Sequence, residues 1–299
     1  MIEPDARARI LMCAPEHFAV SYAINPWMDP AGWARDGGAL AAAAWREWTA
    51  LHRALSDLGA IVELMAPVRG LPDLVFTANS AVVLDGIALL ARFRHAERRR
   101  EEPQVEAAFR KLAGRGLIDA VRRLPDGIAL EGAGDCVFDA SRGLFWMGFG
   151  PRSDAAARSI VAGTFGREVV ALELADPRFY HMDTAFSPLP RGEAMYVPGA
   201  FTPNGLAAIR ERVAPQARIE LGDADAGRLA ANAVAIGDVV VMSSCSGRLR
   251  SVLRERGYRV RTTPLGSFLR SGGSAFCLTL RLDRASMTAT AAARRPAVA

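Results

Sequence analysis

The 299-residue sequence predicts an α/β domain built from five similar units that close around an axis. Three observations support this fold class. Apolar residues recur at helical spacing in several segments, apolar runs joined by Asp-Gly or Gly-Asp predict β-hairpins between them, and a polar residue starts each hairpin segment at a loose interval. Hydrophobic residues make up 51% and charged residues 23%, which excludes a largely disordered or collagen-like chain.

The predicted helices follow from apolar positions three or four residues apart. The longest covers 31–58, where Ala44, Trp48 and Leu51 share one face and Gly59 follows as a stop. The same spacing predicts shorter helices at 101–112, 152–162, 203–213 and 247–256. Each is separated from the next by β-type sequence, so the units read as strand, strand, helix and strand.

The β-type segments contain clear hairpin signals. Asp85-Gly86 stands between two apolar runs, and Gly237-Asp238 repeats the arrangement. The segments cover residues 79–90, 135–147, 184–197, 233–242 and 276–282. The polar residues at their starts are Asn79, Asp135, Asp183, Asn232 and Cys277, separated by 56, 48, 49 and 45 residues. Five units closed around an axis would bring these side chains together at one end of it.

Composition limits the class of protein. Lys and Arg exceed Asp and Glu by 37 to 32, and Arg98–Arg100 lie among glutamates, so nucleic acid is not an expected partner. Four scattered cysteines show neither zinc spacing nor a disulfide framework, and no metal is expected. The sequence lacks a signal peptide and any apolar run of roughly 18 residues, which favours a cytoplasmic protein without a membrane partner. We expect one domain over 1–284 and a disordered tail over 285–299.

The strongest candidate for a nucleophile is Cys277. The turn Gly272-Gly273 delivers it to the start of a predicted strand and leaves space beside the sulfur. A buried structural cysteine is the alternative. His181 and Asp183 stand two residues apart, so a strand would direct both side chains to one side and supply a general acid or base beside a carboxylate. A structural histidine is again the alternative.

Further candidates flank glycine-rich or loop segments. Glu131 and Asp135 border a turn with two glycines, which suits a cationic ligand or else a capped turn. Asn79 offers a donor and an acceptor, although it equally suits a turn. Arg152 and one or two arginines of 92–100 are candidates for binding a carboxylate, while the others are read as a solvated basic loop. A thiol among carboxylates fits a cationic electrophile, of which a guanidinium carbon is an example.

Three motifs carry a family resemblance: Glu131-Gly-Ala-Gly-Asp135, His181-Met-Asp183 and Gly272-Gly-Ser-Ala-Phe-Cys277. In their order and spacing the sequence resembles the guanidine-modifying, or pentein, superfamily, which includes arginine deiminases, dimethylarginine dimethylaminohydrolases and amidinotransferases. Met12-Cys-Ala-Pro, Leu71-Pro-Asp-Leu-Val-Phe-Thr-Ala-Asn79 and Arg92-Phe-Arg-His-Ala-Glu-Arg98 are most similar to the ornithine-forming arginine dihydrolase domain. The resemblance runs from Leu11 to Leu282 and implies a five-bladed α/β propeller.

The resemblance also implies roles for individual residues. Cys277 would form a covalent S-alkylthiouronium, and His181 would protonate the departing ammonia and then activate water. Glu131 and Asp183 would hold the guanidinium nitrogens, with Asp135 and Asn79 also at the substrate. Arg98 and Arg152 would bind the substrate carboxylate, and Asn25 would contact the substrate from its loop. The family implies no cofactor, and a homo-oligomer stays open.

One departure from the family decides the expected product. Deiminases and dimethylargininases usually carry a carboxylate where this sequence has Asn79. An amide can serve both a guanidinium and a neutral ureido oxygen, so citrulline could stay and be attacked again. We therefore expect arginine dihydrolase activity, with ornithine, carbon dioxide and two ammonias as products. The two-domain dihydrolases carry a further downstream domain that this sequence is expected to lack. The alternatives are a citrulline-forming hydrolase of arginine or an N-substituted arginine, and a non-catalytic arginine-binding propeller.

Overall fold

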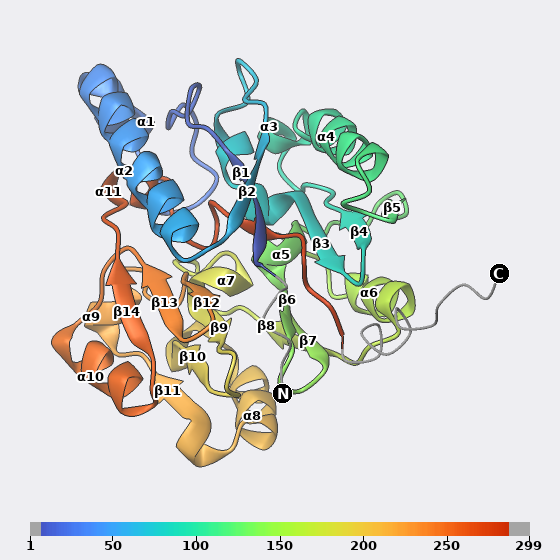
Figure 1. Cartoon of the computed structure of the whole chain (residues 1–299), viewed down its shortest axis with the longest axis vertical. Coiled ribbons are helices and arrows are strands. Elements are labelled where there is room, and N and C mark those ends of the chain that lie inside the picture. The colour runs from blue at the N-terminus through green and yellow to red at the C-terminus, as the bar shows by residue number, and fades with distance from the viewer. Residues whose placement is uncertain (1–6, 287–299) are drawn as a thin grey trace.

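Five three-stranded sheets surround a common axis, as the computed structural model of residues 7–286 shows (Figure 1). Around the ring the sheets consist of β15 (Leu280–Arg281), β1 (Arg9–Cys13) and β2 (Ile61–Met65); β3 (Ala81–Leu84), β4 (Ile87–Leu90) and β5 (Ala120–Arg122); β6 (Cys136–Asp139), β7 (Leu144–Phe149) and β8 (Val169–Glu173); β9 (Phe186–Pro188), β10 (Ala194–Tyr196) and β11 (Arg218–Glu220); and β12 (Val234–Ile236), β13 (Val239–Met242) and β14 (Arg259–Thr262). The predicted five-unit α/β fold is confirmed.

Every sheet follows the same rule. Its first two strands are antiparallel, and the third lies parallel to the second. In four sheets the antiparallel pair is a hairpin, and the predicted Asp85-Gly86 turn takes the left-handed conformation, with φ of 51° and 72°, that a tight hairpin needs. The remaining sheet is completed from the far end of the chain, because β15 pairs with β1 through Ile10 opposite Arg281. The ring is therefore closed by joining early and late segments.

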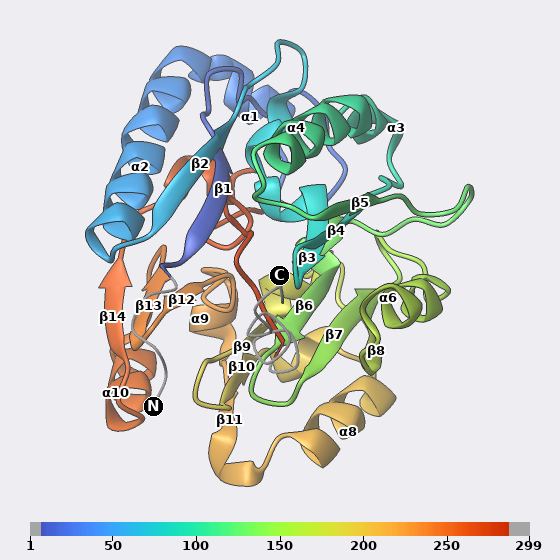
Figure 2. The same ribbon diagram turned by 45° about the vertical axis from the view of Figure 1, so that its right-hand side comes forward.

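A helix covers the outer side of each sheet (Figures 1 and 2). These helices are α2 (Gly37–Asp57), α4 (Glu102–Gly114), α6 (Ala157–Phe165), α8 (Pro203–Arg212) and α10 (Gly247–Glu255). The helix predicted over 31–58 is divided into α1 (Pro30–Arg35) and α2, because Asp36 leaves the helical conformation and two glycines, weak helix formers, follow it. The helix predicted over 152–162 begins later, because residues 151–153 form a bend that buries Arg152.

Short helical turns precede the inner strands and correct two local predictions. They include η2 (Thr77–Ser80), α5 (Gly132–Asp135) and α7 (Met182–Ala185). His181 and Asp183 were expected on a strand, but His181 is the N-cap of α7 and Asp183 lies inside it. Cys277 was expected at a strand start, but it lies in a turn over residues 275–278 before β15. The remaining short elements are η1 (Pro72–Val75), α3 (Ala96–Arg99), η3 (Pro198–Ala200), η4 (Pro215–Ala217), α9 (Asp223–Ala226) and α11 (Gly266–Leu269).

Hydrogen bonds link these turns from one unit to the next. Asp135 Oδ1 accepts from the Met182 amide at 2.9 Å, and Asn232 Nδ2 donates to the Asp183 carbonyl at 3.2 Å. Further bonds join the Cys277 amide to Asn232 Oδ1 and the Ala78 amide to the Cys277 carbonyl, both at 3.1 Å. The polar residues that start the five segments therefore do meet at one end of the axis.

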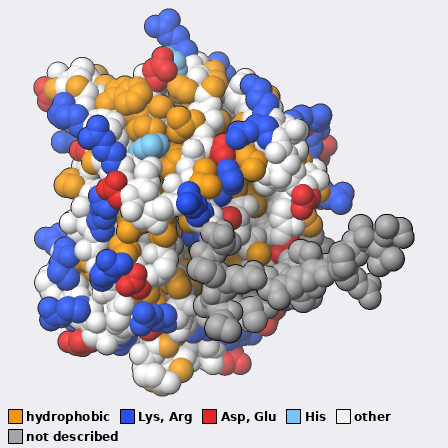
Figure 3. Space-filling model, in the orientation of Figure 1, with side chains coloured by type: hydrophobic (Ala, Val, Ile, Leu, Met, Phe, Trp, Pro, Cys, Tyr) orange, Lys and Arg blue, Asp and Glu red, His pale blue; other side chains and the backbone are white. Residues whose placement is uncertain are grey.

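The outer surface and the chain end add little to the site. Lys and Arg side chains are spread over much of the face in Figure 3, with Asp and Glu side chains among them. Within residues 7–286, no helix is long and apolar enough to cross a membrane. Of the expected tail, Ser286 donates to Asp85 at 2.7 Å through its hydroxyl, and residues 287–299 lie outside the described part of the chain.

Candidate active site

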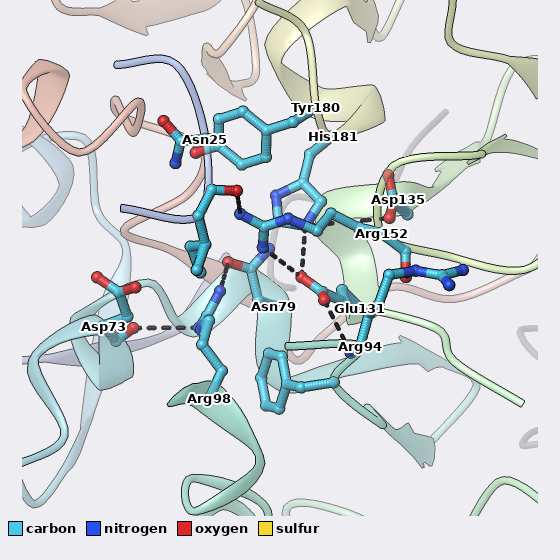
Figure 4. A network of polar contacts seen from close by, with 12 residues as sticks. Asn25, Asp73, Asn79, Arg94, Arg98, Glu131, Asp135, Arg152, Tyr180 and His181 are labelled. Carbon is cyan, nitrogen blue, oxygen red and sulfur yellow. Dashed lines mark hydrogen bonds and ion pairs between the residues drawn. The ribbon is translucent and has the colours of Figure 1, made fainter. Parts of the chain in front are cut away.

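The predicted site residues come together where α5, α7, η2 and the turn at 275–278 meet, and Figure 4 shows all of them except Asp183 and Cys277. Eight of the nine are at most 3% exposed: Asn79, Arg98, Glu131, Asp135, Arg152, His181, Asp183 and Cys277. Asn25 is partly buried and lies on the loop before α1. Such dense burial of charge is costly unless the groups pair with one another or with a ligand, so the partners of each decide what the site can do.

The sulfur of Cys277 lies between an acid and an amide. Its thiol donates to Asp183 Oδ2 at 3.1 Å, and Asn232 Nδ2 donates to the sulfur at 3.0 Å. Burial and the neighbouring Asp183 raise the pKa of the Cys277 thiol, and burial raises the pKa of Asp183 to about 7. Without a nearby cation the thiol therefore keeps its proton, and a cation beside the pair would favour the ionised forms of both groups.

His181 is held as a neutral imidazole. Its Nε2 lies 2.7 Å from Glu131 Oε2, which also accepts from Arg152 NH1 at 2.9 Å. Burial alone would raise the pKa of Glu131, but Arg152 and the His181 hydrogen bond outweigh it and hold this pKa below its usual range. Burial lowers the pKa of His181 to about 4. Nε2 therefore carries the proton toward an ionised Glu131, which leaves the lone pair on Nδ1 available as a base.

Arg98 fixes the orientation of the Asn79 amide. Arg98 NH1 donates to Asn79 Oδ1 at 2.9 Å, so the amide nitrogen must point the other way. Arg98 also forms two bonds to Glu101, at 2.9 and 2.8 Å, and one to the Asp73 carbonyl at 3.2 Å. Four of its five N–H donors are thus used within the protein, and one hydrogen on NH1 remains for a ligand. Arg98 therefore lies on the side of Asn79 that carries the amide oxygen, away from the unpaired amide nitrogen.

Arg152 and Asn25 connect the loop before α1 to the rest of the site. Arg152 NH2 donates to the Ile24 carbonyl at 3.1 Å, and Asn25 Nδ2 donates to the Ser271 carbonyl at 3.1 Å. The Arg152 guanidinium also lies 4.7 Å from the ring centre of Tyr180. The loop therefore closes over the site through one arginine and one amide.

The carboxylate of Asp135 forms hydrogen bonds that link neighbouring elements of the site. Its Oδ2 accepts from the Ser153 hydroxyl at 2.5 Å, its Oδ1 accepts from the Met182 amide, and His181 Nε2 lies 4.0 Å away. Both carboxylate oxygens are thus engaged by the protein. Asp135 joins α5 to α7 and thereby positions Glu131 and His181.

Sequence reasoning missed Asp73 and the contact of Asn232 with the sulfur. Asp73 is 2% exposed, and its Oδ2 accepts from the Tyr22 hydroxyl at 2.8 Å. It lies in the Leu71-Pro-Asp segment, whose resemblance to the dihydrolases gave no role to its carboxylate. Asn232 starts the fourth segment of the repeat. Asp183 and Cys277 also start segments of the repeat. This shared position is the signal that could have identified Asn232 as a residue of the site.

Polar atoms without a partner gather in this site. Within the described residues, ten buried side-chain N or O atoms have no hydrogen bond, and six of them belong here. The six are Asp73 Oδ1, Asn79 Nδ2, His181 Nδ1, Asp183 Oδ1, Ser271 Oγ and Ser274 Oγ. Each such group costs about 1–3 kcal/mol, so their concentration points to a ligand with matching donors and acceptors. Between residues 7 and 286, no group of three or more His, Cys, Asp or Glu side chains could hold a metal ion.

Replacing Gly134 by alanine should damage this arrangement with little loss of fold. A Cβ there would overlap Asn79 Nδ2 and lie 3.6 Å from His181 Cγ. Because Arg98 donates a hydrogen bond to the amide oxygen, Asn79 cannot rotate away from the new Cβ without losing that bond. We expect kcat/KM for the substrate to fall at least about tenfold, with the melting temperature as the folding control. Wild-type kinetics in the variant would show that the Asn79 amide is not needed in this position.

Comparison with known proteins identifies relatives of this chain. The family model described as "N,N dimethylarginine dimethylhydrolase, eukaryotic" matches residues 15–284. The bifunctional arginine dihydrolase/ornithine cyclodeaminase ArgZ of Synechocystis is 42% identical over 274 residues, which cover 92% of this chain and 37% of that protein. N(G),N(G)-dimethylarginine dimethylaminohydrolase of Mycobacterium tuberculosis is 37% identical over 277 residues, with coverage of 92% and 85%. The chain thus spans less than two-fifths of ArgZ.

Solved structures extend the comparison. The N-terminal domain of ArgZ from Cyanobacteria, a cysteine-to-serine variant bound to substrate, matches with a TM-score of 0.86 and 39% identity, over 93% of this chain and 99% of that one. An asparagine-to-serine variant of the same domain, covalently bound to a reaction intermediate, matches equally well. A dimethylarginine dimethylaminohydrolase structure at 20% identity and a TM-score of 0.72 shares the fold. The chain therefore belongs to the dimethylarginine dimethylaminohydrolase family of guanidine-modifying enzymes, hydrolases of amidine carbon–nitrogen bonds.

Proposed function

We propose that this enzyme is an arginine dihydrolase, which converts L-arginine and two waters to L-ornithine, carbon dioxide and two ammonias. The observation that carries the proposal is the amide of Asn79. Arg98 holds the amide oxygen, so a buried and unpaired N–H donor, rather than a carboxylate, points away from Arg98 toward the side of Gly134. The relation to ArgZ supports the same activity.

The guanidinium of the substrate would lie between Asp183 and Glu131, beside the sulfur of Cys277. Asp183 Oδ1 is unpaired and buried, so it offers an acceptor to a guanidinium N–H. Arg152, with the remaining hydrogen of Arg98, would bind the α-carboxylate, and Asn25 would close the loop over the bound substrate. Buried acids outnumber buried arginines in this cluster, which favours a cationic ligand.

The first half-reaction would follow from the protonation states. The bound cation promotes loss of the thiol proton, which His181 Nδ1 accepts. The thiolate of Cys277 attacks the guanidinium carbon, and His181 returns the proton to the departing ammonia, which leaves a covalent S-alkylthiouronium. His181 then deprotonates a water, which attacks the same carbon and expels the thiolate to give citrulline.

The second half-reaction would repeat the chemistry on citrulline. The Asn79 N–H donates to the ureido oxygen and stabilises the charge that develops on it. The thiolate attacks the ureido carbon and a second ammonia leaves. A second water then releases a carbamate, which decomposes to ornithine and carbon dioxide.

Product analysis tests this function directly. The purified enzyme is incubated with L-arginine, dimethylarginine or citrulline, and the amino acids are quantified. Ornithine from both arginine and citrulline would support the dihydrolase. Citrulline as the only end product would refute it and favour the second candidate, a dimethylarginine dimethylaminohydrolase, which the family match and the Mycobacterium relative support. No product from any of the three would favour a non-catalytic arginine-binding protein.

Arginine binding should depend on pH through Asp183. The pKa of this carboxyl is raised to about 7, so below pH 7 a proton must leave before the carboxylate can hold the guanidinium. The affinity of a Cys277→Ser variant for L-arginine should therefore rise about tenfold per pH unit up to pH 7 and level off above it. Calorimetry in buffers of different ionisation enthalpy would count the released proton. A flat profile, or an unchanged slope after adding Asp183→Asn, would contradict this role.

A further inference from the structure

We propose that Asn232 is a catalytic residue that stabilises the Cys277 thiolate by donating a hydrogen bond to it while fixing the backbone that carries it. The inference rests on the proposed function, because it assigns a role within that reaction. It adds a residue that lies just before β12 to the site described above.

Three contacts join Asn232 to the segment that carries the nucleophile. Its Oδ1 accepts from the Cys277 amide at 3.1 Å, its Nδ2 donates to the Cys277 sulfur at 3.0 Å, and its own carbonyl accepts from the Phe276 amide at 3.4 Å. Because Oδ1 must accept from an N–H, the amide cannot be flipped, and the donor must face the sulfur. The side chain is fully buried, so water does not compete for these bonds.

The charges around the sulfur make such a donor necessary. Asp183 lies 3.1 Å away on the other side and opposes a second negative charge. The Ser274 backbone and the Asn232 side chain both lower the pKa of the Cys277 thiol by hydrogen bonding, against the effect of burial and Asp183. Hydrogen bonds to the ionised form of a group favour that form. The dihydrolase reaction needs the thiolate four times, as attacking group and as leaving group in each half-reaction.

The backbone before Asn232 forms a tight turn that determines where its side chain lies. Leu229 is buried and has a φ of +50°, a left-handed conformation that costs a leucine free energy. The Asn232 amide donates to the Leu229 carbonyl at 2.9 Å, which closes the turn. This turn places the side chain between Asp183 and Cys277 at the end of the propeller axis. Strain of this kind is common where function fixes a geometry.

The test separates the donor from the positioning role. Asn232→Asp has nearly the same shape and keeps an acceptor for the Cys277 amide, but an ionised carboxylate donates nothing to the sulfur. Asn232→Leu lacks both groups and cannot donate in any protonation state. The rate of Cys277 alkylation by iodoacetamide is followed from pH 6 to 10 by peptide mass spectrometry, and arginine kinetics are measured in parallel. Asn204→Asp, on the exposed surface of α8, is the matched control.

We expect both Asn232 variants to raise the alkylation midpoint by about one pH unit or more and to lower kcat about a hundredfold, with KM changed less than about threefold. Asn204→Asp should match the wild type in both measurements. An unchanged midpoint in a folded Asn232→Leu variant would overturn the inference, even if turnover fell. If the wild type turned over no arginine but the midpoint still shifted, the proposed function would fail while the role of Asn232 at the sulfur stood.

Discussion

Replacing Cys277 by serine is expected to abolish arginine turnover while leaving arginine binding intact. The sulfur is the only group in the described site that is placed as a covalent nucleophile beside Asp183 and Asn232. A serine hydroxyl has a far higher pKa than a thiol, and neither His181 nor the bound guanidinium can ionise it to a comparable extent. We expect kcat to fall on the order of 10⁴-fold or more.

The measurement is single-turnover product analysis, combined with arginine binding by calorimetry. Cys245→Ser is the matched control, because that cysteine is only partly buried and lies in the loop before α10, outside the site. It should retain wild-type kinetics. Ornithine or citrulline formation by the Cys277→Ser enzyme at more than about a thousandth of the wild-type rate would exclude the covalent mechanism.

Replacing Asn79 by aspartate is expected to change the product from ornithine to citrulline. The carboxylate can still accept from Arg98 and can still pair with a guanidinium, so the first half-reaction should continue. It presents no N–H to the ureido oxygen of citrulline, and its negative charge opposes the charge that develops there. Citrulline should therefore dissociate instead of reacting again.

Two assays check this prediction. With L-arginine the variant should accumulate citrulline, and with citrulline as substrate it should form ornithine at least about a hundredfold more slowly than the wild type. Thermal melting shows whether the Arg98 contact and the fold survive. Should the variant make ornithine from citrulline at the wild-type rate, the second step does not depend on the amide donor.

The five-unit fold could be predicted because the sequence shows both the local turn signals and the interval between units. Hairpin signals such as Asp85-Gly86 depend on local backbone preferences, and the interval of about 50 residues between polar starts reflected the units themselves. Single helical turns such as α5 and α7 could not be predicted, because four residues are too few to show helical periodicity. His181 and Asp183 were therefore assigned to a strand.

The sequence identified residues that lie together in the structure, but not the hydrogen bonds and ion pairs among them. Sequence identified Arg98 as a cation at the site, yet it could not show that Glu101 and Asn79 take up most of its donors. It identified Asp135 as an acid, but its engagement with Ser153 and Met182 depends on the packing of α5 against α7. Partner choice within a cluster of charges is a property of the tertiary structure, which residue types alone do not determine.

The closure of the ring by β15 and β1 has a consequence for biosynthesis. A ribosome makes β15 more than 260 residues after β1. Cys277 stands three residues before β15, so its sulfur acquires Asp183 and Asn232 as neighbours only when this late strand docks. A nascent chain can fold four sheets and still contain no assembled catalytic centre. The neighbours of the Cys277 sulfur are thus assembled only after the segment that contains β15 has been made.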